Sequence, residues 1–312
     1  MMSCTVSDQV RVSVVIAVPD APAAPDAALR SALASDLSEL EVIVVENGPM
    51  DARAAAVQDP RIVRVPMRPG QRALRLRNVG IARARAPYVA LLDPDDLLKP
   101  NQLSATVSAL DRNPEAGFAF SDFECIDESG AVARTSALAD MAHLPALANE
   151  AREGNWQLIR QAALARGLLY QNFIGTSGVV IRRDLLTEIG PFTEVARPCA
   201  DLDYWFRLAH RCDALYSSEV GYSHREGAAA RNRPTGSASK CYITVLRREK
   251  GRWSDRAARR QLDRVIADNL ARIADDQRQR QRRFRSAAAF AHAFATSPDV
   301  RWLGGMLRSI LA

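Results

Sequence analysis

Cysteine is scarce in this chain, and its pattern excludes two common kinds of structural site. The 312 residues include five cysteines, at positions 4, 125, 199, 212 and 241, and no two of them form a CxxC pair. A structural zinc site needs closely spaced ligands, and a disulfide framework needs paired cysteines. We therefore interpret these residues as the reduced thiols of a cytosolic protein. Histidine is rarer still, with four residues and no HExxH zinc motif.

Long hydrophobic runs are also missing. No apolar run approaches the roughly 18–20 residues that a membrane-spanning helix needs. The run at residues 10–18 is short and follows no basic segment, so it lacks the form of a secretory signal. We expect a cytoplasmic protein, because 47% hydrophobic and 25% charged residues are typical of a soluble globular chain. A chain of 312 residues has room for one large α/β domain, with or without an appendage.

Apolar runs and helical patterns alternate through the first hundred residues. Strands are predicted where aliphatic residues cluster, at residues 10–18, 40–45, 61–65 and 89–92. Helices are predicted at residues 26–37, with Asp26 as the N-cap, and at residues 71–86. This alternation predicts a parallel sheet wound with helices.

The rest of the chain continues as a mixed pattern. Strands are predicted at residues 117–126, with a hairpin turn at 127–130, and then at 173–181 and 214–220. Helices are predicted at residues 99–113, 137–170 and 201–211, and from residue 237 onwards.

The most distinctive stretch is Tyr-Val-Ala-Leu-Leu-Asp-Pro-Asp-Asp at residues 88–96. Its carboxylates, Asp93, Asp95 and Asp96, directly follow a predicted buried strand, and ligands of open α/β sheets bind at that end of the strands. Three acids within four residues repel one another unless a cation lies among them. A hard divalent cation that also takes phosphate oxygens suits them. The same residues fit a solvated acidic turn in which Asp96 caps the next helix, so the stretch alone leaves both interpretations open.

Four segments in sequence order carry a family resemblance. They contain Val-Pro-Asp at 18–20, Glu-Asn-Gly at 46–48, Arg-Asn followed by Leu-Asp-Pro-Asp-Asp within 77–96, and Ala-Asp-Leu-Asp-Tyr-Trp-Phe-Arg at 200–207. Over roughly residues 10–225 the chain resembles the family 2 glycosyltransferases, which are inverting enzymes of the GT-A fold.

The resemblance implies an α/β fold and a division of labour along the chain. The GT-A fold is a mostly parallel mixed sheet flanked by helices, with a Rossmann-like nucleotide-binding half. We expect this domain over residues 1–236, with 10–114 binding the nucleotide sugar and 115–236 shaping the acceptor side. Residues 237–312 would form a C-terminal helical appendage.

The resemblance also implies a donor site. Its nucleotide-binding and donor-binding residues would be Val18, Pro19, Asp20, Glu46, Arg77, Asn78, Asp93, Asp95 and Asp96. Asp93 and Asp95 match the family's DxD pair and would hold Mn²⁺ or Mg²⁺, with His224 as a further metal ligand. A divalent ion that bridges both phosphates neutralises the leaving group.

On the acceptor side, the resemblance implies that Asp201 is the general base. The start of a helix favours an ionised carboxylate there. Asp203 is its rival, but it lies two residues further on and points about 200° around the helix. Trp205 either packs in the core or stacks on the acceptor sugar.

Several residues depart from the family pattern. Pro19-Asp20 replaces Tyr-Asn, Glu46-Asn47-Gly48-Pro49 replaces Asp-Asp-Gly-Ser, Gly-Pro-Phe-Thr at 190–193 replaces Gly-Gly-Phe-Asp, and Ala200 replaces a glutamate. These departures motivate an alternative hypothesis, a non-catalytic nucleotide-sugar-binding or assembly subunit with the same fold. A nucleotidyltransferase is disfavoured because residues 19–25 offer no loop with glycine and lysine.

The sequence therefore predicts a metal-dependent, inverting glycosyltransferase of the hexosyl type. It would move a sugar from a nucleoside-diphosphate sugar, a UDP-sugar first of all, to a glycan or lipid-linked acceptor in bacterial polysaccharide or glycolipid assembly. The basic helix predicted at residues 278–285 fits a solvated face or a peripheral contact with the anionic inner face of the membrane. No nucleic-acid partner is expected, because no recognition motif accompanies the charge.

Overall fold

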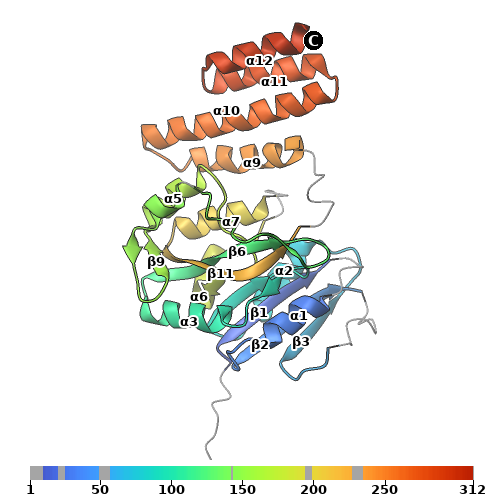
Figure 1. Cartoon of the computed structure of the whole chain (residues 1–312), viewed down its shortest axis with the longest axis vertical. Coiled ribbons are helices and arrows are strands. Elements are labelled where there is room, and N and C mark those ends of the chain that lie inside the picture. The colour runs from blue at the N-terminus through green and yellow to red at the C-terminus, as the bar shows by residue number, and fades with distance from the viewer. Residues whose placement is uncertain are drawn as a thin grey trace, which may run out of the picture. The chain divides into compact units, whose positions relative to one another are not determined.

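The computed structural model describes residues 10–19, 25–48, 57–141, 143–193, 199–226 and 235–311 (Figure 1). The chain divides into two compact units. We call Met1–Leu164, Phe173–Phe192 and Arg207–Gly227 the sheet unit, and Ala165–Asn172, Thr193–Phe206 and Ala228–Ala312 the helical unit.

The sheet unit is built on one mixed sheet of eleven strands. Its path runs β3-β2-β1-β4-β10-β6-β11-β9-β8, with β5 paired to β11 and β7 paired to β6. The strands are β1 (Val12–Val18), β2 (Leu40–Asn47), β3 (Ile62–Met67), β4 (Tyr88–Leu92), β5 (Leu97–Leu98), β6 (Ala116–Ile126), β7 (Val132–Arg134), β8 (Glu150–Ala151), β9 (Trp156–Ile159), β10 (Val180–Arg182) and β11 (Asp213–Arg225). The first four long strands are parallel and β10 runs antiparallel to both neighbours, which confirms the predicted mixed sheet.

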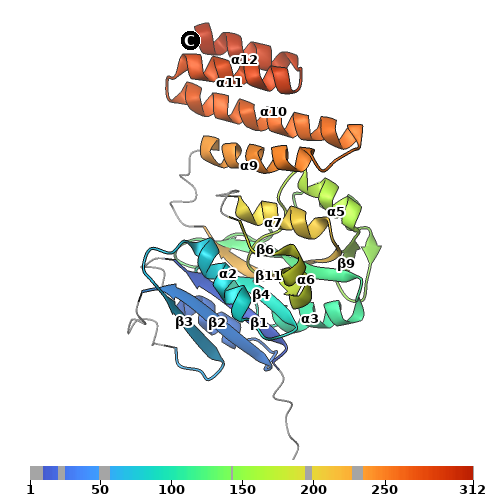
Figure 2. The same cartoon turned by 180° about the vertical axis from the view of Figure 1, so that it is seen from behind.

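The helices of the sheet unit cover both faces of the parallel strands. They are α1 (Asp26–Leu33), α2 (Ala73–Arg83), α3 (Gln102–Arg112), α4 (Leu144–Leu147) and α6 (Arg183–Ile189), while α5 (Gln161–Leu168) and α7 (Ala200–Ala209) belong partly to each unit. Helix α1 lies in front of the strands in Figure 1, and α2 lies in front in the reverse view of Figure 2. Every residue of β1 and β4 is buried, which explains their unbroken aliphatic sequences.

Close packing against the sheet requires glycine at position 80. A Cβ atom added to Gly80 would lie 3.2 Å from Val45 of β2 and closer still to Val15 of β1. Helix α2, which carries Arg77 and Asn78, is therefore held tightly against the first two strands.

Two of the secondary-structure predictions are corrected by the structure. The alanine- and leucine-rich residues 137–170 form only two short helices, α4 and α5, because Trp156–Ile159 between them pairs with β11. Of the strand predicted at residues 173–181, only Val180 and Ile181 belong to a strand, β10.

Two predicted caps are also corrected. Asp26 is the first residue of α1, whose N-cap is Pro25 and lacks a side-chain hydrogen bond. Asp96 caps no helix, because β5 follows it and α3 begins at Gln102.

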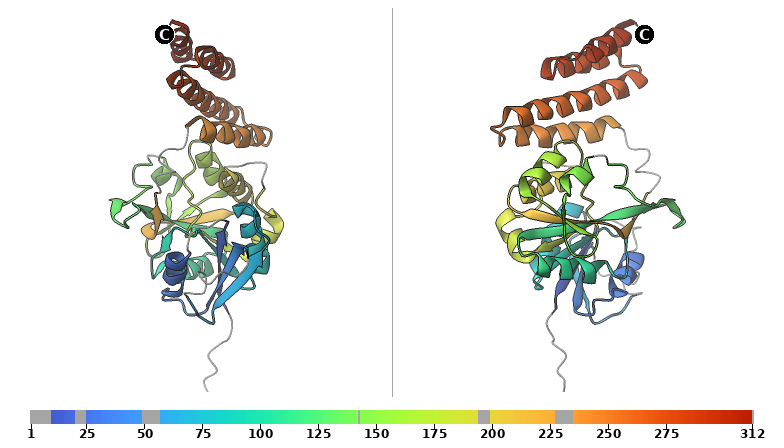
Figure 3. Two further views of the ribbon diagram at one scale, coloured as in Figure 1. Left: turned by 90° about the vertical axis from the view of Figure 1, so that its right-hand side faces the viewer. Right: turned by 60° about the vertical axis from the view of Figure 1, so that its left-hand side comes forward.

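The helical unit contains α9 (Thr235–Lys250), α10 (Arg256–Gln279), α11 (Arg283–Thr296) and α12 (Val300–Leu311), each packed on the next (Figure 3). Asp255 caps α10 by accepting from the backbone N–H groups of Ala257 and Ala258 at 2.9 and 3.4 Å. Residues 278–285 are not one helix as predicted, because α10 ends at Gln279 and Gln281 has a φ of 57°. Across the described residues, no helix is long and apolar enough to cross a membrane.

Candidate active site

The carboxyl ends of the parallel strands bring distant residues to one edge of the sheet. In the register of β1 with its neighbours, Ile16 lies opposite Leu92, and Val18 lies opposite Glu46. Asp93 follows Leu92 directly, so the acidic turn and the ends of β1 and β2 meet at the same edge. This edge is where open α/β sheets bind ligands.

Asp96 is the buried centre of the acidic turn. Its side chain is 2% exposed and accepts hydrogen bonds from Ser177 Oγ at 2.6 Å and from the backbone N–H of Arg225 at 3.0 Å. His224 Nδ1 lies 3.0 Å from the same carboxyl oxygen that Arg225 contacts. Strand β5 pairs with β11 at Leu97 and Ser223, and this pairing carries His224 to the turn. Asp96 therefore organises the site around it.

The carboxylates of the turn affect one another's protonation. Asp95 reaches solvent, yet its pKa is raised above the ordinary value, first because the group is partly desolvated and then because Asp96 and Asp93 repel its charge. The pKa of His224 is raised chiefly by its hydrogen bond to Asp96. The turn thus carries an excess of negative charge.

Arg77 of α2 supplies positive charge beside this turn. Its Nη2 donates to Asp93 Oδ1 at 2.7 Å, and the guanidinium lies 5.2 Å from the centre of the Phe192 ring. The arginine side chain is 12% exposed, whereas that of Asp93 is 36% exposed. A forked, always charged group at this position suits contact with a phosphate.

Asn78, next to Arg77, is used for a structural contact. Its Nδ2 donates to the carbonyl of Phe192 at 2.9 Å, and its Oδ1 accepts from the Phe192 N–H at 2.9 Å. Arg207 holds the same segment from the other side by donating to the carbonyls of Ile189 and Pro191 at 2.8 and 2.9 Å. This segment keeps Phe192 under the Arg77 guanidinium.

Asn47, the last residue of β2, has no predicted role and joins the end of β1 to the segment before α2. Asn47 donates to the carbonyl of Pro19 and, at 2.6 Å, to that of Gln71, and its Oδ1 accepts from the Gln71 N–H at 3.1 Å. Glu46 is 7% exposed, and Arg64 Nη1 lies 3.8 Å from its Oε1. The predicted base-pocket residue Asp20 lies outside the described residues.

The acidic turn and His224 carry side chains of the types that bind a divalent cation, namely carboxylates and an imidazole. Because a carboxylate accepts hydrogen bonds, we place the proton of His224 on Nδ1, which leaves Nε2 as the ligating nitrogen. Metal-binding histidines commonly donate their other ring N–H to a carboxylate in this way. A cation would also relieve the repulsion that raises the pKa of Asp95. Among the described residues there is no group of three or more His, Cys, Asp or Glu side chains arranged to hold a metal ion.

The predicted acceptor-side residues belong to α7 and the helical unit. Asp201 is half-buried in the first turn of α7, and Asn172 Nδ2 donates to its Oδ2 at 3.2 Å. Asp203 is 6% exposed and accepts from Arg248 Nη1 of α9 at 2.9 Å. Trp205 is fully buried, so its prediction as an acceptor contact is wrong, because a ring without exposed surface offers no face to a sugar.

Nothing in the sequence indicated two residues of the site, Ser177 and Arg225. Ser177 accepts from the backbone N–H of Asp93 at 3.0 Å while its hydroxyl donates to Asp96. Arg225 contributes its backbone N–H to Asp96 and its Nε to the carbonyl of Asp95 at 3.3 Å. Backbone donors and single serines form no motif, so only the fold reveals them.

Comparison of the sequence with known proteins shows similarity to one family and to individual relatives. The profile of Glycosyl transferase family 2 matches residues 13–190. The Succinoglycan biosynthesis protein ExoO of Rhizobium meliloti (strain 1021) is 28% identical over 294 residues, which cover 91% of this chain and 76% of that protein. The uncharacterized protein y4gI of Sinorhizobium fredii (strain NBRC 101917 / NGR234) is 31% identical over 188 residues, covering 58% of this chain and 18% of y4gI.

Solved structures confirm the predicted fold. The crystal structure of S. aureus TarS 1-349 matches with a TM-score of 0.60 at 15% identity, over 92% of this chain and 81% of that one. The same protein in complex with UDP-GlcNAc matches with a TM-score of 0.61 at 14% identity, over 92% and 82%.

Proposed function

Because this chain belongs to glycosyl transferase family 2 and is a glycosyltransferase, we propose that its donor is a nucleoside-diphosphate sugar, a UDP-sugar first of all. The acceptor would be a hydroxyl of a glycan or of a lipid-linked sugar. The observation that carries the proposal is the pairing of Arg77 with Asp93 beside the buried Asp96–His224 contact, at the carboxyl edge of parallel strands. Such an edge binds a diphosphate and its metal ion.

The donor-side residues divide the work between charge and position. Asp93, Asp95 and His224 would hold Mn²⁺ or Mg²⁺, which when bound supplies a Lewis acid for the departing diphosphate. Arg77 would turn from Asp93 to a phosphate oxygen and hold the leaving group. Val18, Pro19 and Glu46 would line the base pocket.

On the acceptor side, we propose Asp201 as the general base. Its place in the first turn of α7 favours the ionised carboxylate, and the Asn172 amide orients it. The carboxylate would take the proton of the acceptor hydroxyl as that oxygen attacks the anomeric carbon from the face opposite the diphosphate, inverting the configuration. General base catalysis contributes about 10²–10⁴-fold in rate. Asp203 is already paired with Arg248, which favours Asp201 over it.

A role in polysaccharide assembly is part of the proposal. It rests on the name of the Rhizobium meliloti relative, a succinoglycan biosynthesis protein that matches 91% of this chain. The alternative, a non-catalytic subunit, was motivated by Ala200 and the altered residues 46–49. Ala200 is 2% exposed, so it lies in the core, and the acidic residues of that turn are Asp201 and Asp203.

The end of the helical unit suits contact with an anionic membrane surface. Residues 278–312 contain seven arginines and one aspartate, a net charge of +6 that equals the net charge of the whole chain. On α12, Leu303, Leu307 and Ile310 are 38%, 55% and 53% exposed along one face. The Ser286 and Ser309 hydroxyls lie 2.8 Å apart, so the neighbouring Phe284, 87% exposed, belongs to the same end. Apolar anchors flanked by arginine are typical of interfacial helices.

The experiment that tests the proposed activity is donor consumption. Purified protein is incubated with UDP-, GDP-, dTDP- and CDP-sugars, each with Mn²⁺ and with EDTA, and released nucleoside diphosphate is measured. The proposal expects release from one donor class, dependent on the metal and on an added glycan or lipid-linked acceptor. Failure of every donor, with an extract of lipid-linked acceptors present, would support the non-catalytic alternative.

A further inference from the structure

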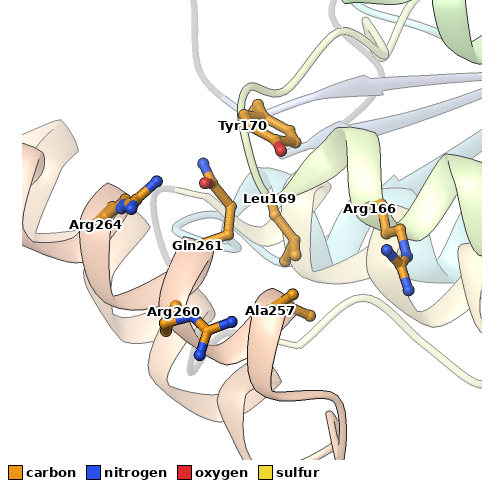
Figure 4. A pocket seen from close by; sticks show the side chains of 8 residues that line it. Arg166, Leu169, Tyr170, Ala257, Arg260, Gln261 and Arg264 are labelled. Carbon is orange, nitrogen blue, oxygen red and sulfur yellow. The ribbon is translucent and has the colours of Figure 1, made fainter.

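The helical unit contains a pocket whose lining includes none of the proposed donor residues. Its volume is about 340 Å³, at the lower end of the roughly 300–1,000 Å³ typical of small-molecule sites. The last turn of α5, the turn after it and the start of α10 form its walls. The lining residues are Arg166, Leu169, Tyr170, Ala257, Ala258, Arg260, Gln261 and Arg264. In Figure 4 the arginines approach from both helices, Arg260 and Arg264 from α10 and Arg166 from α5.

The spacing of residues in the sequence of α10 shows which of them share the face that lines the pocket. Ala257, Arg260, Gln261 and Arg264 follow the i, i+3, i+4, i+7 spacing that places side chains on one side of a helix. The buried stripe of the same helix, which includes Leu262, Val265 and Ile266, lies at other positions. The arginines are therefore not a by-product of core packing, and the small Ala257 leaves space between them.

An ion pair links the two walls of the pocket. Arg166 Nη2 lies 3.2 Å from Asp255 Oδ2, and Asp255 also caps α10. The turn after α5 is held by hydrogen bonds from the N–H groups of Leu169 and Tyr170 to the carbonyls of Arg166 and Gly167, at 3.1 and 2.9 Å. A turn that is already held by its own hydrogen bonds loses little freedom when a ligand binds.

The charge of the pocket is unbalanced. Three guanidinium groups line it, and Asp255 is already engaged by Arg166 and by the start of α10. Within the described part of the chain, Arg260 and Arg264 make no ion pair or hydrogen bond, and both side chains are exposed. Two unpaired forked cations that face one cavity are suited to an oxyanion, above all a phosphate, which accepts two parallel hydrogen bonds from arginine.

We propose that this pocket binds a phosphate or diphosphate group, with Arg260 and Arg264 as its direct contacts and Arg166 as a third positive charge. Tyr170, which is 45% exposed, and the Gln261 amide lie beside the arginines and suit the polar groups of an attached sugar. The group has two sources, a free phosphate compound or the diphosphate headgroup of a prenyl lipid. The inference is independent of the proposed donor, because its test requires no turnover.

The test is calorimetric titration of the full chain in EDTA, which removes divalent metal from the donor residues. The probes are inorganic diphosphate and farnesyl diphosphate. Arg260→Gln combined with Arg264→Gln is compared with Arg259→Gln combined with Arg272→Gln, a pair of exposed arginines of the same helix that do not line the pocket. Both variants lose two charges, and their thermal midpoints verify that they fold.

We expect both probes to bind the wild type and the control pair equally, and to bind the Arg260/Arg264 variant about tenfold more weakly or worse, because two charge-assisted hydrogen bonds are lost. Tighter binding of farnesyl diphosphate than of inorganic diphosphate assigns the pocket to a prenyl-linked headgroup, and equal binding assigns it to a free phosphate compound. The proposal is overturned if neither probe binds the wild type, or if the control pair weakens binding as much as the pocket pair.

Discussion

Arg77 and Asp93 form an ion pair of 2.7 Å across the gap between helix α2 and the end of strand β4. Their positions are fixed independently, since Gly80 seats α2 on the sheet and Ser177 holds the backbone N–H of Asp93. We propose that a bound diphosphate would take Arg77 from Asp93, and that the carboxylate would then be free to hold the metal ion. Donor binding would thus replace one charge pair with two.

Replacing Arg77 with alanine should weaken binding of the nucleoside diphosphate by about tenfold or more, because a charged hydrogen bond contributes roughly 1.5–3 kcal/mol. Arg77→Lys should recover part of this loss, since lysine keeps the charge without the fork. Titration calorimetry measures both. Arg83→Ala is the matched control, an exposed arginine in the last turn of the same helix, and it should bind the nucleotide as the wild type does. Equal binding by Arg77→Ala and the wild type would remove Arg77 from the donor site.

Substitution with asparagine should have different effects at the two aspartates of α7. Asp201→Asn should lower transfer by about 10²–10⁴-fold, as expected for loss of a general base, and leave nucleotide binding and stability unchanged. Asp203→Asn should lower the free energy of unfolding by about 1–2 kcal/mol, because the buried carboxylate loses its pairing with the partly exposed Arg248.

Turnover and urea denaturation measure the two effects on the same preparations. An Asp203→Asn variant that folds normally but cannot transfer sugar, alongside an active Asp201→Asn, would reverse the two assignments.

We expect Asn78 to act by holding the segment that carries Phe192 in place. Asn78→Asp keeps the acceptor for the Phe192 N–H but sets a carboxylate against the Phe192 carbonyl, so one hydrogen bond becomes a repulsion. We expect a loss of about 1–3 kcal/mol in unfolding free energy. We also expect turnover to fall, because the segment that carries Phe192 no longer supports Arg77. Urea denaturation and donor kinetics test this, and an Asn78→Asp protein of unchanged stability would contradict the structural role.

Contact with membranes should depend on both charge and apolar surface. The full chain should float with vesicles that contain anionic lipid and stay behind with neutral vesicles, and added salt should release it. Leu307→Gln combined with Ile310→Gln should weaken flotation without loss of stability, because both side chains are exposed. Val132→Gln, an exposed valine of the sheet unit, serves as the control. Equal flotation with neutral and anionic vesicles, or equal flotation of the wild type and the Leu307/Ile310 variant, would exclude this surface as the membrane contact.

The N-terminal half of the fold could be predicted because three of its strands, β1, β2 and β4, are short, unbroken and buried on both faces. Such strands appear in the sequence as unbroken aliphatic runs, as in β1 and β4, where every residue is buried. Residues 137–170 contain no such run. Its alanines and leucines favour helix locally, whereas the pairing of Trp156–Ile159 with β11 is a long-range contact that overrides this preference.

The candidate site divides in the same way. Asp93, Asp95, Arg77 and Asp201 could be proposed from the sequence because they belong to short motifs in a fixed order. Asp96 appeared as a neighbour of the metal ligands, yet the structure makes it the buried centre that contacts Ser177, His224 and Arg225. Those partners lie 81 to 129 positions away in the chain, so no local sequence pattern predicts them.

The most direct test of the central claim is thermal unfolding with UDP, with and without Mn²⁺, for the wild type and for Asp95→Ala. At a hundredfold excess over Kd, binding adds about 2.7 kcal/mol to the stability of the folded state, which gives a readable rise in Tm. The account predicts a rise for the wild type that requires both UDP and the metal, and none for Asp95→Ala. A rise of the same size without the metal, or in Asp95→Ala, would contradict a metal-held diphosphate at this turn.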